Sequence, residues 1–213
     1  MYSEMLSHRG VLMATNEERK QKTSQKILDV ATRCFMHHGV KATSIAEIAK
    51  MAGVSQVTLY KHYKNKETLA RAAVIKLIDD GYRQDLKILA DTTLTFKEKM
   101  GRLMQQSIAI SKEIHPDFYQ YIVREFSGQH GTNDAMRAYE AQRGQFWGAL
   151  LQQGRDTGEI DSTISNSAVL TYLEMFVQFF VAQSQKNDPV AEKKLREIGP
   201  ELDQLFFYGL IGH

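Results

Sequence analysis

The 213-residue chain has few of the residues that break helices or cross-link distant segments. It contains only three prolines, while Ala, Leu, Gln, Glu and Lys are frequent, which favours an all-helical fold. A disulfide within the chain is excluded because Cys34 is its single cysteine, and we interpret it as a small core residue rather than a redox sensor. The start lacks the basic-then-apolar layout of a signal peptide, so we expect a cytoplasmic protein.

Long apolar runs and the usual signatures of metal or catalytic sites are also missing. The most apolar stretch, Tyr172 to Ala182, is shorter than the ~20 residues that a membrane span needs and contains Glu174, so we expect no membrane association. No His-x-x-x-His or Cys-x-x-Cys pair occurs, and adjacent His37 and His38 point about 100° apart on a helix. With no glycine-rich phosphate loop and no Ser-His-Asp context, we predict no metal, no cofactor and no enzymatic activity.

Charge is distributed unevenly along the chain although its net value is only +2. Residues 1–70 hold 11 lysines and arginines against 6 acidic residues, whereas residues 71–213 hold 16 against 19. The first part is therefore +5 and the second −3. A basic front end joined to an acidic remainder is typical of a DNA-binding module attached to a second module.

The stretch from Thr43 to Leu69 predicts two short helices joined by a sharp turn. Ser44 with Glu47 three residues later forms a capping-box pattern at the start of the first helix. Gly53 can adopt the left-handed conformation that ends a helix, and Ser55 can cap the next one.

The second of these helices has two chemically different sides. Leu59 and Tyr63, four residues apart, are expected to pack inward. The opposite side carries Val57, Thr58, Tyr60 and Lys61, with Gln56 at the helix start. Such a surface suits a recognition helix in the DNA major groove, with contacts to phosphates, base edges and thymine methyl groups. The alternative from this pattern alone is an ordinary solvated helix pair.

A longer string of residues decides between these interpretations. The segment Lys22 to Leu69 closely resembles the N-terminal domain of the TetR family of bacterial transcriptional regulators. The matching residues are Ile27 through Phe35, Gly39, Thr43, Ser44, Ile48, Ala49, Ala52 to Ser55, Thr58 to Tyr60, His62, Tyr63, Lys66, Glu67 and Leu69. Tyr63 stands where the family usually has Phe.

The resemblance implies an all-α fold of about nine helices, with a three-helix helix-turn-helix DNA-binding domain followed by a larger helical effector-binding and dimerisation domain. We predict a flexible N-terminal arm at 1–20, a DNA-binding domain at 21–68 with its motif at about 44–63, and a ligand-binding and dimerisation domain at 69–213. Met13 is a second plausible start of the chain. The predicted DNA-binding residues are Thr43, Ser44, Ser55, Gln56, Val57, Thr58, Tyr60, Lys61, His62 and Lys66.

Hydrophobic periodicity and capping patterns predict the remaining helices. They span about 23–38, 67–90, 95–113, 116–128, 133–157, 165–186 and 190 to the end. Gly81 predicts a bend, and Gly199-Pro200 predicts a kink or two shorter pieces. Gly144 and Gly148 share one helix face, which indicates either close packing of a neighbouring helix, the favoured reading, or space for a ligand.

The helix at 165–186 is apolar almost all round, which requires burial on more than one side. Simple intramolecular core is one explanation. In the family, the last two helices pair across a two-fold axis, so the resemblance implies a homodimer through these helices.

By resemblance the chain is a repressor that binds a near-palindromic double-stranded DNA operator and is released by a small-molecule effector, and it associates with the nucleoid when bound. The alternative is a constitutive dimeric DNA-binding protein with no effector. Many Met and aromatic residues after residue 96 suit an apolar or aromatic effector, with His115, Arg143 and Gln145 as candidate polar contacts. The candidate ligand-binding residues are Met104, Ile108, Phe118, Tyr119, Ile122, Tyr139, Trp147, Tyr172 and Phe176.

Overall fold

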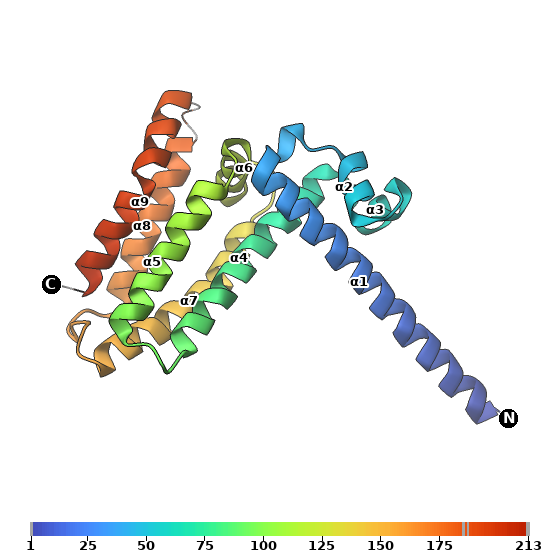
Figure 1. The fold of residues 1–213 in the computed structure, drawn as a ribbon, viewed down its shortest axis with the longest axis horizontal. Helices are drawn as coiled ribbons and strands as arrows, with labels where there is room; N and C mark the ends of the chain where they lie inside the picture. Colours follow the sequence, from blue (N-terminus) through green and yellow to red (C-terminus); the bar gives the residue numbers. More distant parts are fainter. Residues whose placement is uncertain (1, 185, 187, 212–213) are drawn as a thin grey trace. The chain divides into compact units, whose positions relative to one another are not determined.

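The computed structural model describes residues 2–184, 186 and 188–211, and within these residues it contains nine helices and no strand (Figure 1). The chain divides into two compact units, residues 1–73 and 74–213. The helices are α1 (Tyr2–Ala42), α2 (Ile45–Ala52), α3 (Gln56–His62), α4 (Lys66–Ala90), α5 (Phe96–Glu113), α6 (Pro116–Phe126), α7 (Asp134–Asp156), α8 (Asn166–Ser184) and α9 (Pro189–Ile211). The all-α fold predicted from composition and periodicity is confirmed.

The first unit is built on α1, which is longer than predicted. A flexible arm was predicted at 1–20 and the first helix at about 23–38, whereas α1 already begins at Tyr2. The segment contains no proline and a single glycine, Gly10, so local stereochemistry does not prevent a helix there. Regular helix ends at Gly39, as predicted, because its φ of 78° and ψ of 167° are not helical.

Helices α1, α2 and α3 pack around one small core. The side chains of Ile27, Phe35, Ile48 and Leu59 are completely buried. Cys34 is buried among them, as predicted, and burial raises the pKa of its thiol. This core fixes which side of α3 faces inward.

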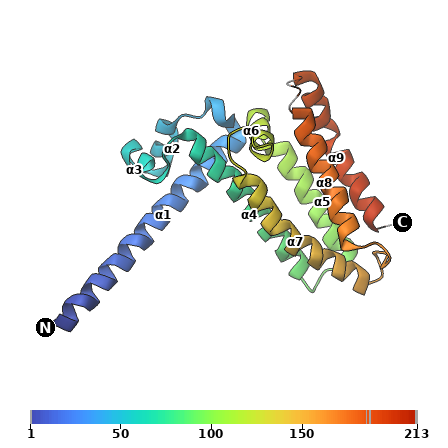
Figure 2. The same ribbon diagram turned by 180° about the vertical axis from the view of Figure 1, so that it is seen from behind.

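The second unit is a helical bundle made from the rest of α4 and from α5 to α9. Helix α5 packs against α9, and α8 lies against α6, α7 and α9. Figures 1 and 2 show α8 and α9 side by side. The division between the units falls after Ala73, inside α4, slightly beyond the predicted boundary at 68. The buried residues in the core of the second unit are Leu89, Phe96, Met100, Leu103, Phe146, Trp147, Leu150, Leu151, Ile160, Val169 and Phe206.

Several predicted helix ends are confirmed by hydrogen bonds. Thr95 and Glu98 form a complete capping box at the start of α5, with the Thr95 amide donating to the Glu98 carboxylate over 2.8 Å. Pro116 occupies the first turn of α6, and Ser165 Oγ accepts from the Ala168 amide at the start of α8. Within the described part of the chain, no helix is long and apolar enough to cross a bilayer.

Helix α9 runs from Pro189 to Ile211 as one element with Pro200 inside it, so of the two alternatives predicted there, a kink or two shorter pieces, the division into pieces is wrong. Helix α4 likewise continues through Gly81. Proline and glycine disfavour a helix interior locally, but tertiary packing overrides this cost. For α9 that packing includes contacts with α5 and α8 and the buried ring of Phe206.

The glycines of α7 differ in what surrounds them. The favoured prediction, that a neighbouring helix packs closely against Gly144 and Gly148, is wrong within a single chain. A Cβ atom added at either position would meet nothing within 4 Å. The close approach occurs instead at Gly154, where a Cβ would lie 2.5 Å from Ile160 Cδ1 and 2.8 Å from Phe96 Cζ. Gly154 therefore lets the loop after α7 and the start of α5 pack against the helix.

This contrast predicts opposite effects for the same substitution on one helix. We expect Gly144→Ala to raise the free energy of unfolding by about 1 kcal/mol, since alanine is the better helix former and has room. Gly154→Ala should lower it by about 1–3 kcal/mol because the added methyl group overlaps Ile160 and Phe96. Urea denaturation followed by circular dichroism measures both. A loss of stability in Gly144→Ala would mean that the assembled protein covers this face.

Candidate nucleic-acid interface and small-molecule cavity

The turn between α2 and α3 is built by two serines and a glycine. Ser44 Oγ accepts a hydrogen bond from the Glu47 amide over 3.1 Å at the start of α2. Gly53 is left-handed, with φ 63° and ψ 38°, and its amide donates to carbonyls at the end of α2. Ser55 Oγ then accepts from the Thr58 amide over 3.0 Å and starts α3. The turn predicted from the sequence is confirmed at each of these positions.

Helix α3 presents a polar surface because its apolar side is anchored. Leu59 is fully buried, whereas 66% of Val57 and 49% of Tyr60 are exposed. Gln56 and Lys61 are exposed on the same helix. The predicted orientation is therefore confirmed, and a row of uncharged and basic side chains is free to meet a ligand on the outside of the first unit.

Tyr63 contributes more than the sequence indicated. Its hydroxyl lies 3.0 Å from Ser24 Oγ and donates to the Ser24 carbonyl over 3.3 Å. These bonds connect the residue after α3 to the middle of α1. The Phe that is usual at this position would have no such hydroxyl, so the difference from the family pattern adds a tie that periodicity alone could not reveal.

The other predicted DNA-binding residues lie around this surface with one exception. Ser44 and Ser55 are exposed caps, and Thr58 is half-buried with its hydroxyl 2.9 Å from Ser55 Oγ. His62 and Lys66 are half-buried as well. Lys66 Nζ donates to the Lys41 carbonyl over 3.2 Å, which fixes its ammonium group at the start of α4.

Thr43 is the exception, and its assignment as a surface contact is wrong. Only 1% of the residue is exposed, and Oγ1 donates to the Gly39 carbonyl over 2.7 Å. This bond satisfies a carbonyl left free where α1 stops being helical at Gly39. Thr43 therefore closes the corner between α1 and α2.

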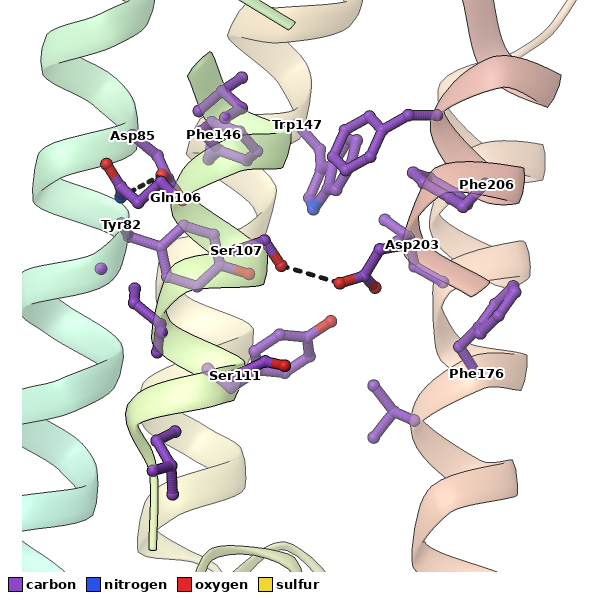
Figure 3. Close-up of a pocket in the computed structure, with 18 of the residues that line it drawn as sticks. Tyr82, Asp85, Gln106, Ser107, Ser111, Phe146, Trp147, Phe176, Asp203 and Phe206 are labelled. Carbon is purple, nitrogen blue, oxygen red and sulfur yellow. Dashed lines mark hydrogen bonds between the residues drawn. The ribbon is translucent and has the colours of Figure 1, made fainter. Parts of the chain in front are cut away.

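The second unit contains a cavity of about 480 Å³ between its helices (Figure 3). Residues from α4 through α9 contribute to its wall, so every helix of the second unit takes part in it. Its lining residues are Gly81, Tyr82, Asp85, Leu103, Gln106, Ser107, Ile110, Ser111, Ile114, Tyr119, Tyr139, Phe146, Trp147, Leu173, Phe176, Val177, Asp203, Phe206 and Phe207.

Two carboxyl groups stand out in this largely apolar wall. Gln106 Nε2 donates to Asp85 Oδ1 over 2.9 Å, and Ser107 Oγ donates to Asp203 Oδ2 over 2.8 Å (Figure 3). Burial raises the pKa of Asp85 to about 6 and raises the pKa of Asp203 from its ordinary value. Each carboxylate is thus hydrogen-bonded by a neutral group but remains costly to ionise.

The predicted ligand-binding set overlaps the cavity only in part. Tyr119, Tyr139, Trp147 and Phe176 line it. Met104, Ile108, Phe118, Ile122 and Tyr172 are outside this lining, as are His115, Arg143 and Gln145.

For three of the predicted residues that do not line the cavity, the structure shows where the side chain lies instead. Phe118 is fully buried in the core, and 47% of Tyr172 is exposed on α8. Arg143 is engaged elsewhere, donating to Glu174 over 2.6 Å with its guanidinium 5.6 Å from the ring centre of Tyr139. Asp85, Gln106, Ser107 and Asp203 were missed because polar residues on separate helices carry no shared signal in the sequence.

The N-terminal part of the chain is similar to a known family and to known proteins. Residues 27–73 match the family model described as bacterial regulatory proteins, tetR family. The HTH-type transcriptional regulator AcrR of Shigella flexneri is 49% identical over 53 residues, which is 25% of this chain and 25% of AcrR. The matched segment thus spans about a quarter of that relative's length.

Two further similarities extend into the second unit. The HTH-type transcriptional repressor KstR2 of Mycolicibacterium smegmatis is 25% identical over 150 residues, covering 70% of this chain and 72% of KstR2. The crystal structure of FadR from Bacillus subtilis, solved in complex with stearoyl-CoA, superposes with a TM-score of 0.51 at 17% identity. It covers 84% of this chain and 96% of that one, and the likeness is one of fold.

The corrected role of Thr43 gives a prediction. We expect Thr43→Val, which keeps the shape and removes the donor to the Gly39 carbonyl, to lower the free energy of unfolding by about 1–3 kcal/mol. Urea denaturation measures this, and DNA affinity measured below the unfolding transition should be unchanged. Normal stability combined with lost DNA affinity would return Thr43 to the contact surface.

Proposed function

We propose that this chain, whose residues 27–73 match the model of the tetR family of bacterial regulatory proteins, is a ligand-responsive, DNA-binding transcriptional repressor of that family. The observation that carries the proposal is the two-sided helix α3, with Leu59 fully buried and Val57 and Tyr60 largely exposed. A helix held this way after a tight turn has the geometry by which helix-turn-helix proteins enter the major groove.

The exposed side chains of α3 divide into two chemical kinds. Tyr60 and Lys61 are suited to phosphate oxygens, and Gln56 and Val57 to base edges and thymine methyl groups. Ser44 and Lys66, at the starts of α2 and α4, add donors where a helix N-terminus favours an anion. The basic balance of residues 1–70 supports this assignment, since neutralising phosphates supplies much of the affinity for DNA.

The cavity in the second unit is the proposed effector site. Its volume of about 480 Å³ lies in the range of small-molecule pockets, and rings such as Trp147 and Phe206 suit an aromatic ligand. FadR, a protein of similar fold, was solved with stearoyl-CoA. The cavity favours an effector-responsive regulator over the alternative, a constitutive DNA-binding protein whose second unit only dimerises.

Exposed apolar residues on α8 and α9 support a dimer through these two helices. Met175 is 61% exposed and Leu205 68%, and Tyr172, Phe179 and Tyr208 are about half exposed. Spacings of three, four and seven residues place those of α8 along one side of the helix. Contiguous exposed apolar side chains of this kind mark an association surface, and a two-fold dimer matches a near-palindromic operator.

The DNA-binding proposal is tested on α3. We expect Tyr60→Ala and Lys61→Ala each to weaken binding to a sequence selected from a random DNA pool by at least about tenfold, because each removes a phosphate or base contact. Fluorescence anisotropy at several salt concentrations measures affinity, and Lys61→Ala should also reduce the salt slope by about one. The control is Lys112→Ala, which removes the same charge from the exposed end of α5.

Normal affinity in both α3 variants, with the dimer intact, would contradict the assignment of this helix. A loss of affinity in Lys112→Ala as large as in Lys61→Ala would instead indicate that only overall charge matters.

The dimer surface is tested by a matched pair of methionines. Met175→Glu places a charge on the exposed apolar side of α8, where a dimer would bury it. We expect this variant to be a monomer at micromolar concentration, measured by sedimentation velocity, where the wild-type protein is a dimer. Met51→Glu, at a 56% exposed position in the first unit, should leave the dimer intact. Dimers that persist in Met175→Glu, or monomers from wild-type protein, would contradict this interface.

A further inference from the structure

We propose that the cavity of the second unit selects a lipophilic organic cation, an aromatic or alkyl group that carries an amine or quaternary ammonium, with its positive charge held by Asp203 and Asp85. The inference deepens the proposed function and rests on it, because it names the chemical class of the effector. It starts from the imbalance of charge in the cavity wall.

The described part of the cavity wall contains negative side chains and no positive ones. Among the described residues that line the cavity, two are aspartates and none is lysine, arginine or histidine. The described neighbours that hydrogen-bond these carboxylates are the Gln106 amide and the Ser107 hydroxyl, both neutral. Both carboxylates are half-buried. A partly desolvated carboxylate without a cationic partner is less favourable than one in water, so a bound cation would supply what the protein does not.

A positive side chain that contacts a ring of the cavity wall is already paired. Arg143 on α7 forms an ion pair with Glu174 over 2.6 Å and lies over the ring of Tyr139. It is not part of the cavity lining. The same absence of basic groups disfavours anionic ligands, whose head group would have no partner and would lie against two acids.

Each aspartate lies beside an aromatic ring on its own helix. Tyr82 precedes Asp85 by three residues on α4, and Phe206 follows Asp203 by three residues on α9, so each pair projects from one helix face. Figure 3 shows Asp203 directed into the cavity between Ser107 and the rings of Trp147 and Phe206. Aromatic faces attract cations within about 6 Å, and this attraction grows when water is excluded.

The rings also define the apolar part of the ligand. Trp147 packs edge-on against Phe206 with ring centres 5.4 Å apart, and Phe176 lies 6.1 Å from Phe206. These rings, with Phe146 and Phe207, line the cavity together with the carboxylates and come from α7, α8 and α9. A ligand that places a charge at Asp203 therefore has aromatic surface on which to stack its remainder.

The test compares two ions of the same shape and opposite charge, tetraphenylphosphonium and tetraphenylborate, on the full chain. Trp147 is the only tryptophan and lines the cavity, so quenching of its fluorescence reports occupancy, and isothermal titration calorimetry gives the affinity. We expect the cation to bind at least tenfold more tightly than the anion. Stearoyl-CoA, an anionic ligand of a different class, is titrated in parallel and should bind no better than the borate.

Isosteric variants then test whether the carboxylates of Asp203 and Asp85 bind the cation. Asp203→Asn and Asp85→Asn keep the shape of the side chain, and each should weaken binding of tetraphenylphosphonium by about tenfold while leaving the circular dichroism spectrum unchanged. Glu140→Gln, an exposed carboxylate on α7 outside the cavity lining, makes the same change of charge and should have no effect.

Equal binding of the two ions, a preference for the borate or stearoyl-CoA, or unchanged affinity in both Asn variants would overturn the inference. These results are separable from failure of the proposed function. A protein that binds its selected DNA but not the cation refutes only the ligand class, whereas one that binds the cation but no DNA refutes the regulator.

Discussion

Helix α3 has only seven residues, too few to remain helical in water, so its surroundings must impose its structure. Left-handed Gly53 redirects the chain, Ser55 accepts a hydrogen bond from the free amide of Thr58, and burial of Leu59 fixes the rotation of the helix about its axis. The hydroxyl of Tyr63 ties the far end to α1. Together these contacts hold the inner side of α3 in one orientation. The outer side of the same helix, which is the proposed DNA surface, is therefore fixed as well.

The second unit combines a packed hydrophobic core with a cavity, so its helices must be held in place without filling all the space between them. Its core is continuous on the side of α7, where Leu150 and Leu151 are completely buried and Gly154 allows close packing. Toward α5 and α9, polar residues such as Ser107 and Asp203 replace part of the apolar filling. A pocket with hydrogen-bonded polar groups in a wall of rings is the usual form of a small-molecule site.

Features that depend on neighbouring residues could be predicted from the sequence, including the caps at Ser55 and Thr95 and the buried position of Leu59. Features that depend on which distant helices meet could not. Asp85 and Asp203 share a cavity although 118 positions separate them in the sequence, and no periodicity connects them. The burial of Thr43 could not be predicted because its hydroxyl donates to a carbonyl of the preceding helix. The continuity of α9 could not be predicted because packing outweighs the local preference of Pro200.

The chain contains one thiol and one indole, and they lie in different units. Cys34 is buried between α1 and α2, where burial raises its pKa and slows its reaction with thiol reagents. Trp147 is buried in the bundle core. Labelling kinetics at the sulfur and emission from the ring therefore record the opening of each unit independently, without any engineered probe, and comparing them in denaturant shows whether the two halves melt together or in sequence.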